Sequence, residues 1–186
     1  LAIAGDPVDL AYVGSRTLKG LAENGHIINV DIPQSQIGMY QPGILNTVSH
    51  MGKVWGYPRA FSTKALFMNC DLLEQAGVAC EGPKTWDELY TMAEAVTNNV
   101  PGVAGIGLTG KDFDNTMHQF LNYLYSNGGQ VIDPDTNTIT LNSSNAVEAL
   151  AFYGKLANVA QEGPLAYERS QLRDLLNDKK IAMYID

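Results

Sequence analysis

The sequence predicts an α/β fold, in which strands and helices alternate along the chain. Short apolar runs with strand character are separated by segments in which apolar residues recur at helical spacing. Gly, Pro and Asn residues stand between these segments and mark turns. The composition, 45% hydrophobic and 17% charged, is that of an ordinary globular protein. Alternation of this kind is typical of a sheet layer covered by helices.

The first sixty residues predict one strand, one helix and a long loop. An apolar strand at Asp9–Gly14 follows a Gly-Asp-Pro turn at residues 5–7. The helix after it closes at Asn24–Gly25 and carries on one face Leu18, Leu21 and Ala22. Residues 30–51 are rich in Pro, Gln, Gly and Ser and predict a surface loop with room for a short helix.

The middle of the chain predicts two strands and two helices. Strands at 53–58 and 60–69 are kept apart by Pro58, which cannot continue a hydrogen-bonded ladder. A short helix then stops at Gly77. Thr85 and Glu88 form a capping box, in which each side chain would bond to the other residue's amide, at the start of a second helix. Its apolar positions repeat at helical spacing: Trp86, Leu89, Ala93 and Val96.

The remaining elements continue the alternation. A buried-type strand at 103–108 precedes a helix with the apolar residues Phe113, Met117, Phe120, Leu121 and Leu124. A hairpin turns at Pro134. Ser143 or Ser144 caps a long helix with an expected inward face of Val147, Leu150, Ala151 and Gly154. A last helix, with Leu172, Leu175 and Leu176, leads into a strand at 181–185.

Composition and motifs exclude several functions. The net charge of −8 and twelve dispersed Lys and Arg residues argue against nucleic-acid binding. The three His residues have no metal-ligand spacing, and no nucleophile motif is present. Gly105–Gly110 matches G-x-G-x-x-G, but its residues look like a strand rather than the turn that a nucleotide fingerprint requires. We interpret it as a Gly-rich strand packed close to a helix.

Cys70 and Cys80 flank the short helix that stops at Gly77. Two interpretations stay open: a pair of partly buried free thiols, or a disulfide formed in an oxidising compartment. A straight helix would hold the two Cα atoms too far apart for a bond. A disulfide therefore requires the chain to double back after Gly77.

Polar side chains follow three strand ends, where open α/β sheets bind their ligands. The segments are Gly14–Thr17, Arg59–Ser62 and Gly110–Asp114. Their mixture of cationic, hydroxyl, carboxylate and aromatic groups suits a sugar. The candidate ligand-binding residues are Ser15, Arg16, Thr17, Arg59, Phe61, Ser62, Asp112, Phe113 and Asp114.

The chain resembles the sugar-binding, maltose-binding-protein-like family of extracellular solute-binding proteins of ABC importers. Residues 52–58 (Gly-Lys-Val-Trp-Gly-Tyr-Pro) resemble the family pattern G-K-x-Y-G-x-P. Residues 69–77 resemble its N-K-D-L-x-x-x-A-G, and residues 83–89 (Pro-Lys-Thr-Trp-Asp-Glu-Leu) resemble its P-x-T-W-D-E-L. Asn127-Gly-Gly with the hairpin and capped helix, and residues 176–183, extend the likeness over most of the chain.

The resemblance implies a type II periplasmic-binding-protein-like fold, with two α/β lobes joined by crossover hinge strands. Residues 1–58 would be part of the first lobe, and residues 59–186 a nearly complete second lobe. The implied function is capture of a small polar solute, most simply a sugar or oligosaccharide, by hinge closure and delivery to an ABC permease. It implies no reaction and no cofactor, and a location in the periplasm or at a lipid anchor outside the cytoplasmic membrane.

Two alternative functions stay open, and the ends of the sequence lead to a further expectation about the fold. A polyamine or other non-sugar solute would suit Asp112, Asp114 and the acidic balance, and a glycosidase could use such an acid pair. The start at Leu1 and the apolar end at residues 181–186 indicate an internal fragment whose first lobe is incomplete. We expect such a fragment to bind solute poorly, and its open sheet edges to let two copies pair.

Overall fold

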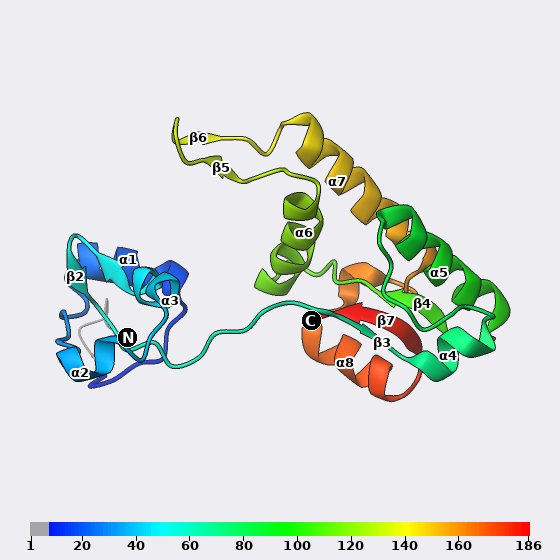
Figure 1. The fold of residues 1–186 in the computed structure, drawn as a ribbon, viewed down its shortest axis with the longest axis horizontal. Coiled ribbons are helices and arrows are strands. Elements are labelled where there is room, and N and C mark those ends of the chain that lie inside the picture. Colours follow the sequence, from blue (N-terminus) through cyan, green and yellow to red (C-terminus); the bar gives the residue numbers. More distant parts are fainter. Residues whose placement is uncertain (1–7) are drawn as a thin grey trace. The chain divides into compact units, whose positions relative to one another are not determined.

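A computed structural model describes residues 8–186 of the chain (Figure 1). The chain divides into two compact units, Leu1–Ser62 and Thr63–Asp186. That residues 1–58 and 59–186 belong to two functional lobes stays a prediction. The Gly-Asp-Pro turn expected at residues 5–7 lies outside the described residues.

The first unit consists of short elements: α1 (Ser15–Glu23), α2 (Gln34–Ile37), α3 (Pro42–Thr47), β1 (Ser49–His50) and β2 (Lys53–Val54). The helix predicted before Gly25 is confirmed as α1, which buries Leu18 and Ala22. Gly25 takes a φ of +68°, which favours glycine and ends the helix there. The predicted loop before residue 51 contains two short helices rather than one.

The strand predicted at Asp9–Gly14 is wrong. No helix or strand is present at residues 8–14, and within the described chain no backbone hydrogen bond pairs residues 8–13 with another segment. Leu10 is 92% exposed. An apolar run forms a strand only where a neighbouring strand completes its hydrogen bonds, and the described residues offer this run no such neighbour.

The strands predicted at 53–58 and 60–69 are much shorter in the structure. Lys53–Val54 pairs with β1 across a tight turn at Met51–Gly52, where both residues have positive φ. The second run is ordered as a strand only at β3 (Leu66–Met68). Residues 55–65 between them are irregular, so the two predicted strands are separated by a long stretch without strand structure rather than by a single break at Pro58.

The second unit is built on a three-stranded sheet of β3, β4 (Ala104–Gly107) and β7 (Ile181–Ile185). β7 is the central strand, parallel to β4 and antiparallel to β3. Residues 181–184 are fully buried or nearly so. The predicted strands at 103–108 and 181–185 are thus confirmed, and the predicted fold class is observed as helices packed on a mixed sheet.

Two clusters of buried side chains hold helices against this sheet. The larger includes Met183 and residues of α4 (Cys70–Gln75), α5 (Trp86–Asn99), α6 (Asp114–Ser126) and α7 (Ser144–Lys155). The smaller joins Ile181 and Tyr184 to Leu172 of α8 (Arg169–Asn177). In Figure 1, α8 lies on the opposite side of β7 from α5. A hairpin, β5 (Ile132–Asp133) and β6 (Thr138–Ile139), connects α6 to α7, and two 3₁₀ turns, η2 (Leu156–Val159) and η3 (Pro164–Ala166), lead from α7 to α8.

The capping box expected at Thr85 and Glu88 is half correct. The Thr85 hydroxyl accepts a hydrogen bond from the Glu88 amide at 3.1 Å, as predicted. The Glu88 carboxylate accepts instead from the Lys84 amide at 2.6 Å, one residue before the expected partner. The side chain therefore fixes the residue that leads into the helix rather than the capping residue itself.

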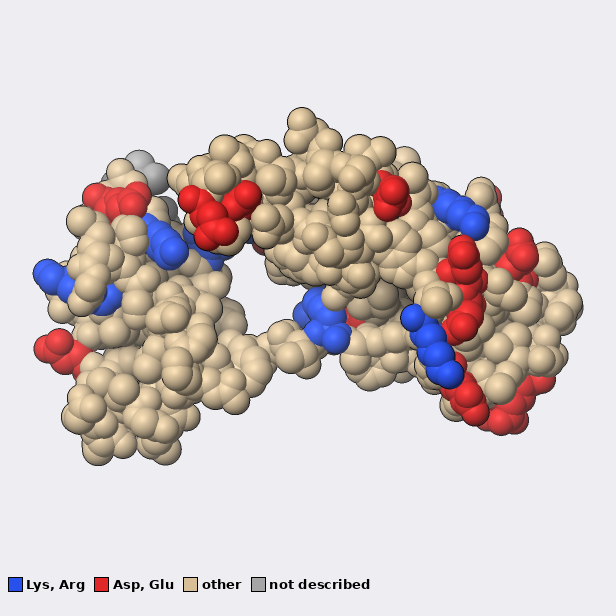
Figure 2. Space-filling view, turned by 45° about the horizontal axis from the view of Figure 1, so that its top comes forward, with Lys and Arg blue, Asp and Glu red and all other residues tan. Residues whose placement is uncertain are grey.

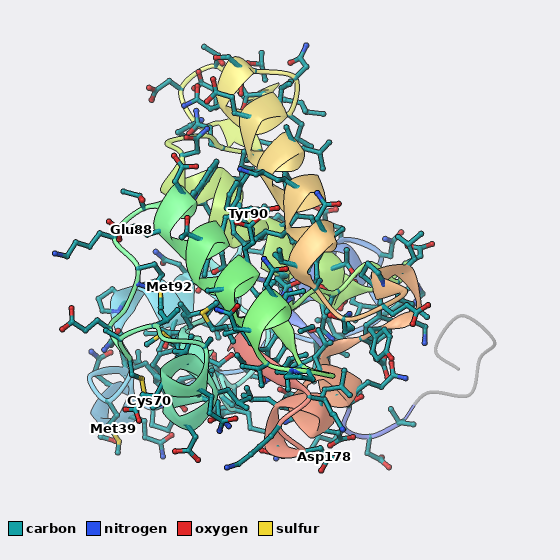
Figure 3. All side chains as sticks on the ribbon, turned by 90° about the vertical axis from the view of Figure 1, so that its right-hand side faces the viewer. Met39, Cys70, Glu88, Tyr90, Met92 and Asp178 are labelled. Carbon is teal, nitrogen blue, oxygen red and sulfur yellow. A yellow bond between two sulfur atoms is a disulfide. The ribbon has the colours of Figure 1, made fainter. Side chains whose placement is uncertain are left out.

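The open question about the cysteines is answered by a disulfide between Cys70 and Cys80, with a Cα–Cα distance of 5.2 Å. Cys70 begins α4 (Figure 3). Cys80 lies in the loop before α5. Gly77, at a φ of +80°, reverses the chain between them. The disulfide thus fastens the end of this loop to the start of the short helix.

The faces predicted for α6 and α7 need correction. Val147 and Leu150, expected inside, are 59% and 60% exposed, and Ala151 and Gly154 are exposed as well. α7 buries Phe152 and Tyr153 instead, and Ser143 is its cap. The two aromatic rings pack against rings of α5 and α6, which turns their side of the helix inward. Phe113, which directly precedes α6, and Met117 within it are likewise exposed, whereas Leu124 is buried.

Candidate functional site

One edge of the sheet in the second unit carries a set of charged and aromatic side chains. Because β4 and β7 are parallel, their carboxyl ends reach the same edge, and antiparallel β3 begins there. We call this the carboxyl edge and define it by Lys64, Lys111, Asp112, Phe113, Arg169 and Asp186. Edges of this type are where α/β sheets hold ligands.

A buried polar network anchors the loop that leaves β4. The Gln161 amide donates to the Leu108 carbonyl at 2.7 Å and accepts from the Leu108 amide at 2.9 Å. Gln119 of α6 accepts from both the amide and the hydroxyl of Thr109. The Tyr153 hydroxyl lies within hydrogen-bond distance of the Thr109 carbonyl and of Gln119. Burial raises the pKa of Tyr153 to about 12, so its hydroxyl stays protonated and holds the loop as a donor.

Beyond this anchor the loop presents charged and aromatic side chains to solvent. Lys111, Asp112 and Asp114 are exposed, and Phe113 is 53% exposed. The Lys111 carbonyl accepts from the Thr116 hydroxyl at 2.6 Å, which ties the loop to the first turn of α6. A rigid base with an exposed carboxylate, ammonium and aromatic ring can bind a polyhydroxyl molecule through hydrogen bonds and ring contact.

A cluster of charges joins the ends of β3 and β7. The Asp186 carboxylate is paired with Lys64 at 3.3 Å and with the Arg169 guanidinium, and its side chain is only 10% exposed. Ala65 and Asp186 also exchange two backbone hydrogen bonds. Burial raises the pKa of nearby Tyr184 well above its ordinary value, and the Asp186 charge adds to this effect. The cluster fixes the entry of the chain into the second unit.

The six candidate residues of the first unit form two groups. Ser15, Arg16 and Thr17 are exposed in the first turn of α1, where the Thr17 hydroxyl donates to the Gly14 carbonyl at 2.9 Å. Arg59 lies over the ring of Tyr12, 4.9 Å from its centre. Phe61 and Ser62 are exposed at the end of this unit. A role of any of the nine candidate residues in binding stays a prediction.

The sequence did not single out Lys64, Arg169 and Asp186. Asp186 directly follows an apolar strand, and the rule applied to the other strand ends would have selected it. Lys64 and Arg169 carry no comparable signal, because Lys64 meets an acid 122 residues away in the sequence. Only the pairing of β3 with β7 brings these groups together.

The described residues hold neither a metal-binding cluster nor a helix that could span a membrane. Among residues 8–186, no cluster of His, Cys, Asp and Glu could hold a metal ion. No described helix is both long and apolar enough to cross a membrane. On the face drawn in Figure 2, Lys and Arg side chains are scattered among neutral and acidic ones and form no continuous basic patch.

Comparison with known proteins gives a match over nearly the whole chain. The family model for "Bacterial extracellular solute-binding protein" matches residues 2–186. A putative binding protein of Brucella abortus is 28% identical over 186 residues, which is 98% of this chain and 44% of that protein. A maltodextrin-binding protein of Bacillus subtilis is 30% identical over 157 residues, or 82% of this chain and 35% of that protein.

Solved structures agree with the sequence comparison. An ABC transporter solute-binding protein of Thermotoga lettingae, crystallised with α-D-tagatose, superposes with a TM-score of 0.79 at 25% identity. The match covers 91% of this chain and 45% of that protein. The chain thus spans less than half the length of each of these three relatives.

Proposed function

The chain belongs to the family of bacterial extracellular solute-binding proteins and has the α/β fold of type II periplasmic binding proteins, and on this premise we propose that it captures a neutral polyhydroxyl solute, a sugar or an oligosaccharide. Members of this family are binding proteins for ABC transporters rather than enzymes. The hypothesis that Asp112 and Asp114 serve as the acid pair of a glycosidase is therefore set aside.

The proposal rests on the side chains exposed at the carboxyl edge. Asp112 and Phe113 are exposed on a loop whose base is held by Gln119, Tyr153 and Gln161. A carboxylate that accepts hydrogen bonds from sugar hydroxyls, beside an aromatic ring that covers C–H groups, is the usual chemistry of carbohydrate recognition. The maltodextrin and tagatose named for two relatives are solutes of this class.

The remaining parts of the proposal concern the full-length protein. Capture would proceed by hinge closure, and a membrane permease would receive the solute. The periplasm, or a lipid anchor outside the cytoplasmic membrane, is the location that suits this role. The extracellular character of the family supports this location.

A calorimetric titration of the full-length protein tests the class of solute. The panel consists of maltotriose, D-tagatose, ribitol and spermidine. We expect heat of binding with at least one of the three polyhydroxyl compounds and none with spermidine. Tight binding of spermidine, with no response to any of the other three, would replace the sugar by a polyamine and give Asp112 and Asp114 the role of ammonium ligands.

A further inference from the structure

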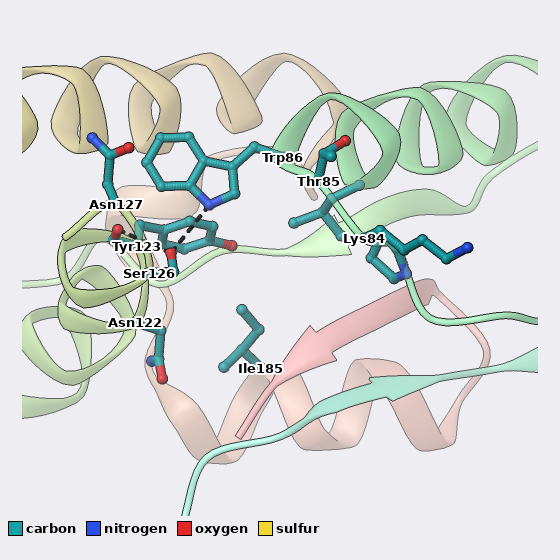
Figure 4. Close-up of a pocket in the computed structure, with 10 residues that line it drawn as sticks. Lys84, Thr85, Trp86, Asn122, Tyr123, Ser126, Asn127 and Ile185 are labelled. Atoms are coloured by element: carbon teal, nitrogen blue, oxygen red, sulfur yellow. Dashed lines mark hydrogen bonds between the residues drawn. The ribbon is translucent and has the colours of Figure 1, made fainter.

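A pocket of about 490 Å³ lies between the start of α5 and the end of α6. Figure 4 shows Trp86 above it, Tyr123 and Ser126 at one side and Ile185 of β7 below. Its volume falls within the range of small-molecule sites. None of the nine residues predicted as ligand-binding lines it.

The Tyr123 hydroxyl is the unusual group in this pocket. Tyr123 is only 2% exposed, and its hydroxyl has no hydrogen-bond partner among the described residues. In Figure 4 the hydroxyl points toward the middle of the pocket. A buried hydroxyl without a partner costs free energy, and a ligand that accepts its hydrogen bond would remove that cost. Burial also raises the pKa of Tyr123 far above its ordinary value, so that the group remains a donor.

The walls around this hydroxyl are already fixed. The Trp86 ring stacks on Phe152 with centres 4.7 Å apart and meets the Tyr123 ring edge-on at 6.1 Å. The Trp86 indole N–H donates to the Ser126 hydroxyl at 3.1 Å, which in turn donates to the Tyr123 carbonyl at 3.0 Å. These contacts hold the two aromatic rings in place, so that a ligand reaches the hydroxyl, which has almost no accessible surface, through small displacements of the other lining side chains.

The lining residues restrict the charge of the ligand. They comprise apolar, aromatic, hydroxyl and amide side chains, and include no carboxylate. Lys84 is the one charged residue among them and is exposed to solvent. The lining therefore offers a cation no opposite charge. A neutral molecule with hydroxyl groups could contact the aromatic rings, form hydrogen bonds with the amides and accept one from the Tyr123 hydroxyl.

We propose that the pocket between α5 and α6 is a second binding site, which takes a neutral polyhydroxyl molecule whose oxygen accepts a hydrogen bond from Tyr123. This site goes beyond the proposed function, because it lies wholly within one unit and involves none of the residues assigned to solute capture. It can therefore be occupied whether or not the carboxyl edge binds the transported solute.

The two tryptophans of the chain supply a site-specific test. Trp86 lines the pocket, whereas Trp55 belongs to the first unit. We would titrate the ¹⁵N-labelled chain with D-glucose and with ribitol, and follow the two indole N–H signals by NMR. The expected result is a saturable shift of the Trp86 signal with at least one probe, and no shift of the Trp55 signal.

Tyr123→Phe tests the role of the hydroxyl, and Tyr125→Phe is its control, because Tyr125 lies on the same helix, is exposed and does not line the pocket. Tyr123→Phe should weaken binding of the probe about 3- to 10-fold, as expected for one hydrogen bond between neutral groups. It should also raise the melting temperature of the unliganded chain, because it removes an unpaired buried group. Tyr125→Phe should change neither quantity.

Three outcomes would overturn the proposal. The first is a Trp86 signal that stays unmoved by both probes in the folded chain. The second is equal affinity of the parent chain and Tyr123→Phe. The third is a shift of Trp86 that depends on protein concentration without any probe, which would mean that a second copy fills the pocket.

Discussion

Gly105 determines how closely β4 approaches α5. A Cβ atom at this position would overlap the backbone of Ala93, including its carbonyl oxygen, and the Gly105 amide donates to the Thr97 hydroxyl at 2.9 Å. That the glycine-rich segment is a strand packed close to a helix could be predicted from the sequence, because Ile106 and Leu108 alternate with glycine as strand residues do. The partner helix could not be identified from the same segment.

Gly105→Ala is therefore expected to destabilise the chain by about 1–3 kcal/mol or more, since backbone atoms must move to admit the methyl group. Chemical denaturation followed by circular dichroism measures the change. Gly154→Ala is the matched control, because Gly154 lies in α7 with open space around it. That substitution should stabilise the helix by roughly 0.5–1 kcal/mol. Equal stability of the two variants would contradict the close packing of β4 on α5.

At the scale of elements, helix limits were easier to predict than helix faces. Thr85, Ser143 and Gly77 mark helix ends through local hydrogen bonds and backbone conformation, which depend on neighbouring residues alone. The buried face of α7 was predicted wrongly because apolar residues surround much of this helix. The choice between its faces depends on Trp86 and Tyr123, which pack on Phe152 from other helices.

The disulfide between Cys70 and Cys80 closes a loop that contains α4. Cross-linking across ten positions of sequence should stabilise the chain by roughly 2–3 kcal/mol, because the unfolded chain loses conformational freedom. We expect the double variant Cys70→Ser/Cys80→Ser to unfold at lower denaturant concentration than the oxidised parent. A reducing agent should lower the stability of the parent to that of the variant and leave the variant unchanged. No difference between the oxidised and reduced parent would contradict the bond.

The turn of the β5–β6 hairpin should respond to pH. The Asp133 carboxylate accepts from the amides of Asp135 and Thr136 at 2.8 and 3.2 Å, and these bonds hold its pKa below the ordinary value of 3.8. Because the folded state lowers this pKa, the contribution to stability is present above about pH 4 and is lost as the pH falls through the folded value. NMR titration of the carboxyl carbon should give a midpoint below 3.8. Asp133→Asn should remove this residue's contribution to the pH dependence of stability, because the side chain no longer titrates but keeps an acceptor oxygen for the turn. A titration midpoint of the Asp133 carboxyl at or above the ordinary value of 3.8 would contradict this prediction.

At the scale of the whole molecule, the family could be identified from the sequence because its motifs are local. The pattern at residues 83–89 predicts the start of a helix, and the pattern at residues 69–77 predicts a short helix and its end. Both features are present in the structure. The candidate site was predictable only in part. The loop at 110–114 directly follows a strand, whereas the pairing of Lys64 with Asp186 depends on a contact across most of the chain.

Pairing of two copies of the chain is supported by none of the comparisons and stays a prediction. β3 and β4 are the outer strands of the described sheet, and outer strands can extend a sheet into a second molecule. Sedimentation velocity at several concentrations would reveal such a dimer.

The most direct test of the account is the effect of Asp112→Asn on solute binding by the full-length protein, measured by calorimetry with maltotriose and with D-tagatose. Asp135→Asn is the matched control, because Asp135 is an exposed acid on the β5–β6 hairpin. We expect Asp112→Asn to weaken sugar binding about 10- to 100-fold, as for the loss of hydrogen bonds to a charged group, and Asp135→Asn to leave it unchanged. Equal affinity of the Asp112→Asn variant and the parent would contradict the assignment of the carboxyl edge as the solute site.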